Sequence, residues 1–433
     1  MTPRDGRINP GRYRDVGPKQ LEGSQAVARA VARCRPEVIP AYPISPQTHI
    51  VEALSAMVKA GEVGSCEFVN VESEYAAMSV AIGASATGAR TYTATASQGL
   101  LYMAEALYNA SGLGLPIVMT LANRAIGAPI NIWNDHSDSM SQRDSGWIQL
   151  YVESNQEAAD THVLAFRLAE ELSLPVMVCM DGFVLTHAYE RVDVPSSEQV
   201  ERFLPAYEPR QVLDPDEPVS IGAMVGPEAF MEVKYLAHVQ QMQALDLIPA
   251  LTEELAGVLG RAQGGLVREY ESAGAETIVV ALGSVLGTIE DAVDELRARG
   301  VSVGAVGIKA FRPFPLQELR AALAGAKRIV VLEKALALGI GGIVAQNVRI
   351  AIAGSGAHVY TAIAGLGGRP ITKASLCRLL DDAAAERLQA MTFLDLDRGL
   401  VERELERTRA KRRSGPHAEN MLRDIGVVAA GPV

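Results

Sequence analysis

Residues 68–100 read FVNVESEYAAMSVAIGASATGARTYTATASQGL, and the order of residue types in this stretch decides the fold. A short apolar run ends at Val71, and two carboxylates, Glu72 and Glu74, follow it closely. Small residues in a helical pattern then continue to about Ala86. We therefore predict a strand, a turn that carries two acids, and a helix.

The predicted helix places Glu74 at the head of its apolar face. Residues three, four and seven positions further along share that face, and they are Ala77, Met78 and Ala81. Burial penalises the charged form of a carboxyl, so we expect Glu74 to be ready to exchange a proton. A first-turn acid that only complements the helix dipole explains this stretch equally well.

Strands and helices alternate through the first part of the chain. The strands are expected at residues 37–42, 67–71, 90–95 and 116–121. This order predicts a parallel sheet with helices on both faces, where ligands bind outside the carboxyl ends of the strands. Polar residues fall just past those ends, namely Ser45, Glu74, Ser97, Gln98 and Arg124. We therefore predict a functional site at this edge of the sheet.

Four long runs of sequence carry a resemblance to a known family. They are AYPISPQTHIVEALS (41–55), VNVESEYAAMSVAIGASATGARTYTATASQGL (69–100), NRAIGAPINIWNDHSDSMSQRDSGW (123–147) and LPVMVCMDGFVLTH (174–187). Together they resemble the alpha subunit of 2-oxoacid:ferredoxin oxidoreductases, and the pyruvate or 2-oxoisovalerate type is the nearest branch. The resemblance covers about residues 22–187 and continues more weakly at 311–315 and 365–368.

The resemblance implies an α/β fold with two folded domains. The first is a parallel-sheet, thiamine-diphosphate-binding domain of the pyrimidine type, and the second is a smaller α/β domain like the C-terminal domain of transketolase. The expected divisions are an N-terminal arm (1–20), the first domain (21–195), a connector (196–265), the second domain (266–390), and a charged helix with a tail (391–433). We expect the connector to pack on the first domain, and the charged tail helix to be solvated rather than a specific binding arm.

The same resemblance implies a function and assigns roles to the predicted site residues. It implies oxidative decarboxylation of a 2-oxoacid, with pyruvate favoured, to acyl-CoA and CO2 with electrons passed to ferredoxin. Glu74 matches the catalytic glutamate that hydrogen-bonds N1′ of the cofactor's aminopyrimidine, and Ser97 and Gln98 fall beside it as cofactor-binding residues. Arg124 matches the arginine that pairs with the substrate carboxylate. Ser45 stands where relatives commonly have threonine, so the substrate pocket is expected to be slightly larger.

Two absences in the sequence indicate that partner subunits complete the enzyme. There is no Gly-Asp-Gly followed by Asn, the family signature for magnesium and diphosphate, and the four cysteines are far apart, whereas iron–sulfur clusters need closely spaced cysteines. We therefore expect no metal on this chain, a beta subunit at the diphosphate end, and gamma and ferredoxin-like delta subunits or their equivalents. Alternatives are another substrate (2-oxoisovalerate, 2-oxoglutarate or oxalate) or a non-catalytic scaffold subunit of such a complex.

Composition narrows the class of protein further. The net charge of −11 argues against a nucleic-acid-binding surface. The first residues have no apolar signal core, and no stretch approaches the ~18 apolar residues of a membrane span. The expectation is a cytoplasmic protein that binds neither nucleic acid nor membrane, and scattered cysteines fit a reducing compartment.

Three further patterns have competing interpretations. The run Asp135-His136-Ser137-Asp138 contains metal-ligand residue types, but loop capping and subunit packing are favoured. His187 could be a general acid, although a histidine without a visible partner is more often structural. Gly283-Ser284-x-x-Gly287 follows an expected strand and could hold a phosphate, whereas close strand–helix packing is favoured.

Overall fold

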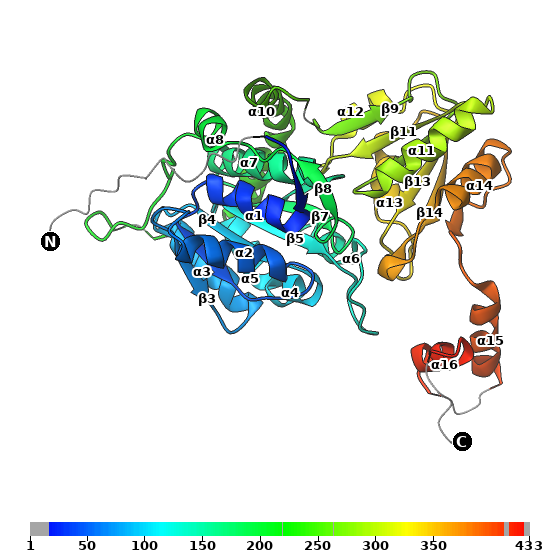
Figure 1. Cartoon of the computed structure of the whole chain (residues 1–433), viewed down its shortest axis with the longest axis horizontal. Coiled ribbons are helices and arrows are strands. Elements are labelled where there is room, and N and C mark those ends of the chain that lie inside the picture. Colours follow the sequence, from blue (N-terminus) through cyan, green and yellow to red (C-terminus); the bar gives the residue numbers. More distant parts are fainter. Residues whose placement is uncertain (1–16, 219, 263, 411–414, 428–433) are drawn as a thin grey trace.

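A computed structural model describes residues 17–218, 220–262, 264–410 and 415–427. The chain forms two sheets that each carry helices on both faces, and a small helical pair near the C-terminus lies apart from them (Figure 1). The predicted arm at residues 1–20 lies mostly outside the described residues. The α/β fold class predicted from the sequence is confirmed.

The first sheet has seven strands in the order β12-β6-β7-β5-β4-β2-β3. All neighbouring strands are parallel except β12 and β6. Their bounds are β2 Val38–Ala41, β3 Glu67–Asn70, β4 Thr91–Thr95, β5 Ile117–Asn123, β6 Ile148–Tyr151, β7 Val176–Asp181 and β12 Ala310–Arg312. The four strands predicted from the sequence agree with β2, β3, β4 and β5 to within two residues at each end.

Helices cover both faces of this sheet, as the parallel pairing requires. One apolar cluster joins the sheet to α1 Gly23–Arg33, α2 Thr48–Lys59, α7 Asn155–Leu172 and α10 Ala244–Leu259. A second cluster joins the sheet to α3 Glu74–Ala86, α4 Ser97–Tyr102 and α5 Ala104–Gly112. A short ladder between β1 Lys19–Glu22 and β8 Tyr189–Val192 ties the start of α1 to the chain beyond β7.

The helix α3 begins and packs as the sequence predicts. The Ser73 hydroxyl accepts a hydrogen bond from Ala76 N at 3.2 Å, which caps the helix start. The face headed by Glu74 is buried, together with Ala77, Met78 and Ala81. Glu74 is therefore held at the carboxyl end of β3 by a capped helix with a buried apolar face.

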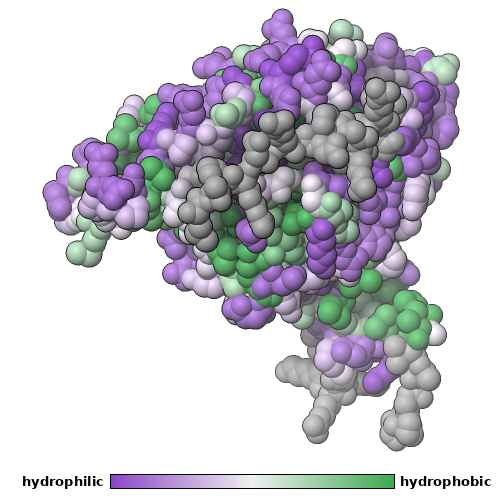
Figure 2. Space-filling view, turned by 60° about the vertical axis from the view of Figure 1, so that its left-hand side comes forward, coloured by the Kyte–Doolittle hydropathy of each residue, from purple (hydrophilic) through white to green (hydrophobic). Residues whose placement is uncertain are grey.

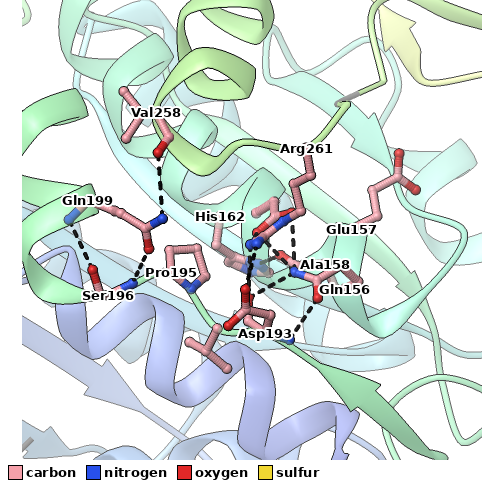
Figure 3. A network of polar contacts seen from close by, with 12 residues as sticks. Gln156, Glu157, Ala158, His162, Asp193, Pro195, Ser196, Gln199, Val258 and Arg261 are labelled. Atoms are coloured by element: carbon pink, nitrogen blue, oxygen red, sulfur yellow. Dashed lines mark hydrogen bonds and ion pairs between the residues drawn. The ribbon is translucent and has the colours of Figure 1, made fainter. Parts of the chain in front are cut away.

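The connector contains α8 Ser197–Phe203, α9 Phe230–Met242 and α10. Its far end is fixed to the first domain by Arg261, which donates to both carboxylate oxygens of Asp160 (2.8 and 2.6 Å) and to the carboxylate of Asp193 (3.1 Å) (Figure 3). Gln199 of the α8 capping box donates to Val258 O at 3.5 Å in the same network. The connector therefore packs on the first domain.

The second sheet has six strands in the order β15-β14-β13-β10-β11-β9, and only β9 is antiparallel to its neighbour. Their bounds are β9 Val267–Tyr270, β10 Thr277–Ala281, β11 Val303–Ile308, β13 Arg328–Glu333, β14 His358–Ile363 and β15 Met391–Phe393. Apolar clusters place α11 Val285–Ala298 and α14 Lys373–Ala384 on one face, and α12 Leu316–Ala322 and α13 Val344–Ala351 on the other. The predicted domain limits stay predictions, and β12 lies across them by joining the first sheet.

The C-terminal helices α15 Arg398–Arg409 and α16 His417–Asp424 pair with one another through Glu404, which accepts from Arg407, His417 and Asn420. Most side chains of α15 are exposed. In the face shown in Figure 2, hydrophobic residues gather in a central area, whereas hydrophilic residues cover most of the rest. Within the described residues, no helix combines the length and the apolarity that a membrane crossing demands.

Candidate functional site

The predicted site lies where the strand order of the first sheet reverses. From β2 the chain adds β3 on one side and then returns to add β4 on the other. At such a point two loops leave in opposite directions, which opens a crevice outside the carboxyl ends of the strands. Neighbouring strand ends here carry Glu74 after β3, Ser45 after β2, Ser97 and Gln98 after β4, and Arg124 after β5. The structure thus brings the predicted residues to adjacent positions along one edge.

The absence of a side chain at Gly99 lets the Glu74 carboxyl pack against the start of α4. The Glu74 side chain is buried, with 8% of the residue exposed. A Cβ at Gly99 would lie 2.7 Å from Glu74 Oε1 and 2.5 Å from the Thr95 hydroxyl oxygen. That hydroxyl is buried and has no hydrogen-bond partner among the described residues. A buried carboxyl and a hydroxyl without a partner at this strand end fit the chemistry of an aminopyrimidine edge, because a polar ring edge needs polar partners.

Arg124 is buried and oriented by three acceptors. Its guanidinium donates to the backbone carbonyl of Ser45 (2.7 Å), to Gln98 Oε1 (3.2 Å) and to the carbonyl of Asn131 (3.2 Å). Because a guanidinium has five N–H donors, these contacts leave one N–H on each terminal nitrogen among the described residues. Burial lowers the pKa of Arg124, while Asp138 and Glu74 raise it. The arrangement leaves a fixed pair of donors that suits a carboxylate.

The remaining predicted residues lie around Arg124. Ser97 is buried in a left-handed conformation (φ 48°), and its hydroxyl donates to the carbonyl of Ala125 at 2.5 Å. Gln98 is partly exposed, whereas Ser45 is exposed. The Ser45 backbone carbonyl therefore positions Arg124, and the exposed side chain of Ser45 stays at the mouth of the crevice.

Asp138, which the sequence analysis considered only within the 135–138 run, organises the site. It is fully buried and accepts four N–H donors: Ser97 N (2.9 Å) and Arg124 N (2.9 Å) on Oδ2, and Asn123 Nδ2 (2.8 Å) and Ser139 N (2.8 Å) on Oδ1. Burial raises the pKa of Asp138 to about 7, although these hydrogen bonds act in the opposite direction. One carboxylate thus clamps the loop after β4 to the loop after β5. No local pattern predicts this, because its partners are 14 and 41 positions away.

Other residues of the 135–138 run bond within the protein, in agreement with the expected loop capping, whereas the expected subunit packing stays a prediction. Asp135 accepts from Ser137 N at 3.0 Å and from Gly367 N at 3.0 Å in the second domain. His136 contacts Asp181 through Nε2 at 2.6 Å. These contacts stabilise the loop and its junction with the second domain.

Asp181, at the end of β7, occupies the position where a phosphate was considered. The start of α11 donates to it from Ser284 N at 3.0 Å and from the Ser284 hydroxyl, and Lys334 Nζ lies 2.9 Å away. Burial would raise the pKa of Asp181, but Lys334 and His136 outweigh burial and hold the pKa well below its usual range. The anion at this helix start is therefore a carboxylate of the first domain, and the glycine pattern serves domain packing.

His187 has partners that the sequence did not reveal. Its Nδ1 lies 2.7 Å from the Thr186 hydroxyl, and its ring lies 4.7 Å from the rings of His49 and Phe183, measured between centroids.

The four cysteines are buried free thiols, and burial raises the pKa of Cys34 and of Cys66 to about 12. At these positions the thiols pack in the core as neutral groups.

Comparison with known proteins agrees with this architecture. A family model described as pyruvate flavodoxin/ferredoxin oxidoreductase, thiamine diphosphate-binding, matches residues 29–251. A model described as pyruvate:ferredoxin oxidoreductase core domain II matches residues 275–376. Pyruvate synthase subunit PorA of Methanosarcina barkeri is 47% identical over 393 residues, which cover 88% of this chain and 97% of that relative.

A further relative and one solved structure are also similar to this chain. Ketoisovalerate oxidoreductase subunit VorA of Pyrococcus abyssi is 38% identical over 367 residues, covering 84% of this chain and 93% of that relative. A solved 2-oxoglutarate:ferredoxin oxidoreductase from Magnetococcus marinus shares the fold with a TM-score of 0.63 and 21% identity, and the match covers 85% of this chain and 66% of the longer one. The predicted resemblance and the thiamine-diphosphate-binding fold that it implied are confirmed. The chain belongs to the pyruvate flavodoxin/ferredoxin oxidoreductase family.

Proposed function

We propose that this chain is the alpha subunit of an enzyme that converts pyruvate, coenzyme A and oxidised ferredoxin into acetyl-CoA, CO2 and reduced ferredoxin. The observation that carries the proposal is the meeting of Glu74 and Arg124 at one strand-order reversal, where each is buried and keeps polar capacity toward the crevice. Pyruvate is favoured over 2-oxoisovalerate because the relatives named for pyruvate synthase reach 48% identity, whereas those named for ketoisovalerate oxidoreductase reach 39%.

Glu74 would hold the aminopyrimidine end of thiamine diphosphate. When bound, this cofactor supplies the electron sink for loss of CO2 from a 2-oxoacid. A buried carboxyl beside Gly99 would hydrogen-bond the ring, which is the role that the resemblance to relatives assigns to Glu74. The Thr95 hydroxyl is a second polar group beside Gly99, and it has no hydrogen-bond partner among the described residues.

Arg124 would bind the carboxylate of pyruvate through the two N–H groups that its protein contacts leave. Its three acceptors keep the planar group in place, so little conformational entropy is lost when the substrate arrives. Gln98 Oε1 accepts a hydrogen bond from Arg124, and the amide nitrogen of Gln98 would then face the cofactor. The exposed Ser45 hydroxyl is available to the substrate at the mouth of the crevice.

Partner subunits would complete the site. We propose a beta subunit that binds magnesium and the diphosphate end, with gamma and delta subunits or their equivalents for coenzyme A and electron transfer. The buried, separate thiols of this chain support the placement of iron–sulfur clusters on those partners. The complex would work in the cytoplasm.

The test is Glu74→Gln in the co-expressed complex, with pyruvate, coenzyme A and ferredoxin as substrates. We expect kcat to fall by roughly 10²–10⁴, because the amide keeps size and a hydrogen bond but cannot exchange the proton. The matched control is Glu72→Gln, an exposed acid two positions away, which should leave kcat nearly unchanged. Activity of the Glu74 variant within about threefold of wild type would show that Glu74 only complements the helix dipole, an interaction that contributes about 0.3–1 kcal/mol to stability.

A further inference from the structure

Three side chains outside the crevice gather in a group with the composition of a metal site. Glu22, His49 and His187 each offer one ligand atom, and all three atoms lie within 4.8 Å of one another. His49 Nδ1 already contacts Glu22 Oε1 at 2.6 Å, and the two imidazole rings lie 4.7 Å apart between centroids. Two histidines and one carboxylate form a ligand set of zinc sites that leave a fourth position open.

The backbone holds two of these residues in register. Glu22 ends β1 and pairs with Tyr189 of β8, so the chain that carries His187 runs beside it. Gly23 N donates to Ala188 O at 3.0 Å, and Ser24 N donates to Thr186 O at 2.9 Å. Glu22 and His187 are therefore fixed to one another by the ladder, and His49 meets them from the first turn of α2.

Supporting contacts favour metal binding by the histidines. The Thr186 hydroxyl lies 2.7 Å from His187 Nδ1 and orients that ring, which leaves Nε2 as a ligand atom. The His49 side chain is 46% exposed, so an ion can reach the group from solvent.

We propose that Glu22, His49 and His187 bind one divalent ion of the zinc type. Tetrahedral coordination with bonds of about 2.0–2.1 Å requires ligand atoms roughly 3.4 Å apart. His49 Nδ1 and Glu22 Oε1, which are 2.6 Å apart, therefore need to separate by about 0.8 Å, whereas a pair at the 4.8 Å limit needs to close by about 1.4 Å. The half-exposed His49 side chain can rotate to make this adjustment. The site lies outside the reaction crevice and serves to bind β1, α2 and the segment after β7 together.

An ion bound at this position would also affect the turn that contains Ser45. A Cβ at Gly182 would lie 2.6 Å from Pro46 Cγ, so the segment after β7 packs against the residue that follows Ser45. His49 is four residues beyond Ser45 at the start of α2. A bound ion would therefore fix the helix that follows the Ser45 turn.

The test uses the full chain after treatment with EDTA, with Co²⁺ as a visible probe and Zn²⁺ measured by calorimetry. We expect one ion per chain, a visible cobalt spectrum typical of four or five ligands, and displacement of Co²⁺ by Zn²⁺. His49→Gln and His187→Gln should each weaken Zn²⁺ binding at least about 100-fold, and Thr186→Ala about 10-fold. The matched control is His358→Gln, a histidine of the second sheet outside the group, which should bind Zn²⁺ as wild type does.

Circular dichroism of each variant checks that the fold is kept, and His49→Gln is suited to this because that side chain is half exposed. Zn²⁺ should also raise the melting temperature of wild type but not of folded His49→Gln. Absence of stoichiometric binding, or equal affinity in wild type and the two histidine variants, would overturn the proposal and leave Glu22 and His49 as a simple ion pair.

Discussion

The replacement Asp138→Asn tests whether one buried carboxylate assembles the crevice. Each oxygen of Asp138 accepts two N–H donors, and Oδ2 takes both Ser97 N and Arg124 N. An asparagine has the same shape but carries only one acceptor oxygen. Whichever way the amide turns, its NH2 group faces two N–H donors that then lose their partner. The variant therefore breaks two of four hydrogen bonds without creating a cavity.

The magnitude follows from the number and kind of bonds lost. Hydrogen bonds to a charged group contribute about 1.5–3 kcal/mol each, so two of them amount to roughly 3–6 kcal/mol. Part of this loss is offset because a neutral amide is easier to bury than a carboxylate, and burial raises the pKa of Asp138 to about 7. We expect a net fall of about 2–4 kcal/mol in the free energy of unfolding.

The assays are urea unfolding of the chain and steady-state kinetics of the assembled complex. Because the loops after β4 and β5 lose their common anchor, kcat/KM for pyruvate should fall at least about 10-fold even where the complex is folded. The control Asp144→Asn changes an acid of the same segment whose side chain is 66% exposed, and it should alter stability by less than about 0.5 kcal/mol. Wild-type stability and kcat/KM in Asp138→Asn would refute the clamp.

Arg124→Lys should lower kcat/KM for pyruvate roughly 10- to 150-fold, because about 1.5–3 kcal/mol of transition-state binding is lost, and the affinity for thiamine diphosphate should stay the same. An unchanged kcat/KM would show that Arg124 only orders its loop. Lys334→Met should cost about 3–5 kcal/mol in urea unfolding by leaving Asp181 buried without its main cation, and a loss below about 1 kcal/mol would contradict this. Burial lowers the pKa of His162 from 6.5 to about 4, so as the pH falls the unfolded chain takes up a proton at this histidine before the folded chain does. The free energy of unfolding should therefore fall by about 3 kcal/mol between pH 6.5 and pH 4. His162→Gln should remove that part of the pH dependence, and an unchanged slope would disprove the assignment.

Local patterns were sufficient for the elements and for most of the predicted site. The helix from Glu74 to Ala86 was predicted because small residues and an apolar face at helical spacing act within a few residues, and the structure adds a cap at Ser73. The strand ends were equally local, and parallel sheets place ligands at those ends. Ser45, Glu74 and Arg124 could therefore be named, and a resemblance to relatives gave them their roles.

Contacts between distant segments were decided only by the tertiary structure. The order of strands brings Asp138 to the loops after β4 and β5, and it joins β12 to the first sheet. Domain packing turns Gly283 and Ser284 toward Asp181. None of these pairings has a local signature in the sequence. The meeting of His187 with His49 and Glu22 likewise depends on the β1–β8 ladder. Sequence determined which segments become helices and strands, because those preferences act over a few neighbours. Which polar side chains face one another was decided by packing, because a buried charge is tolerated only where the assembled fold supplies its partners.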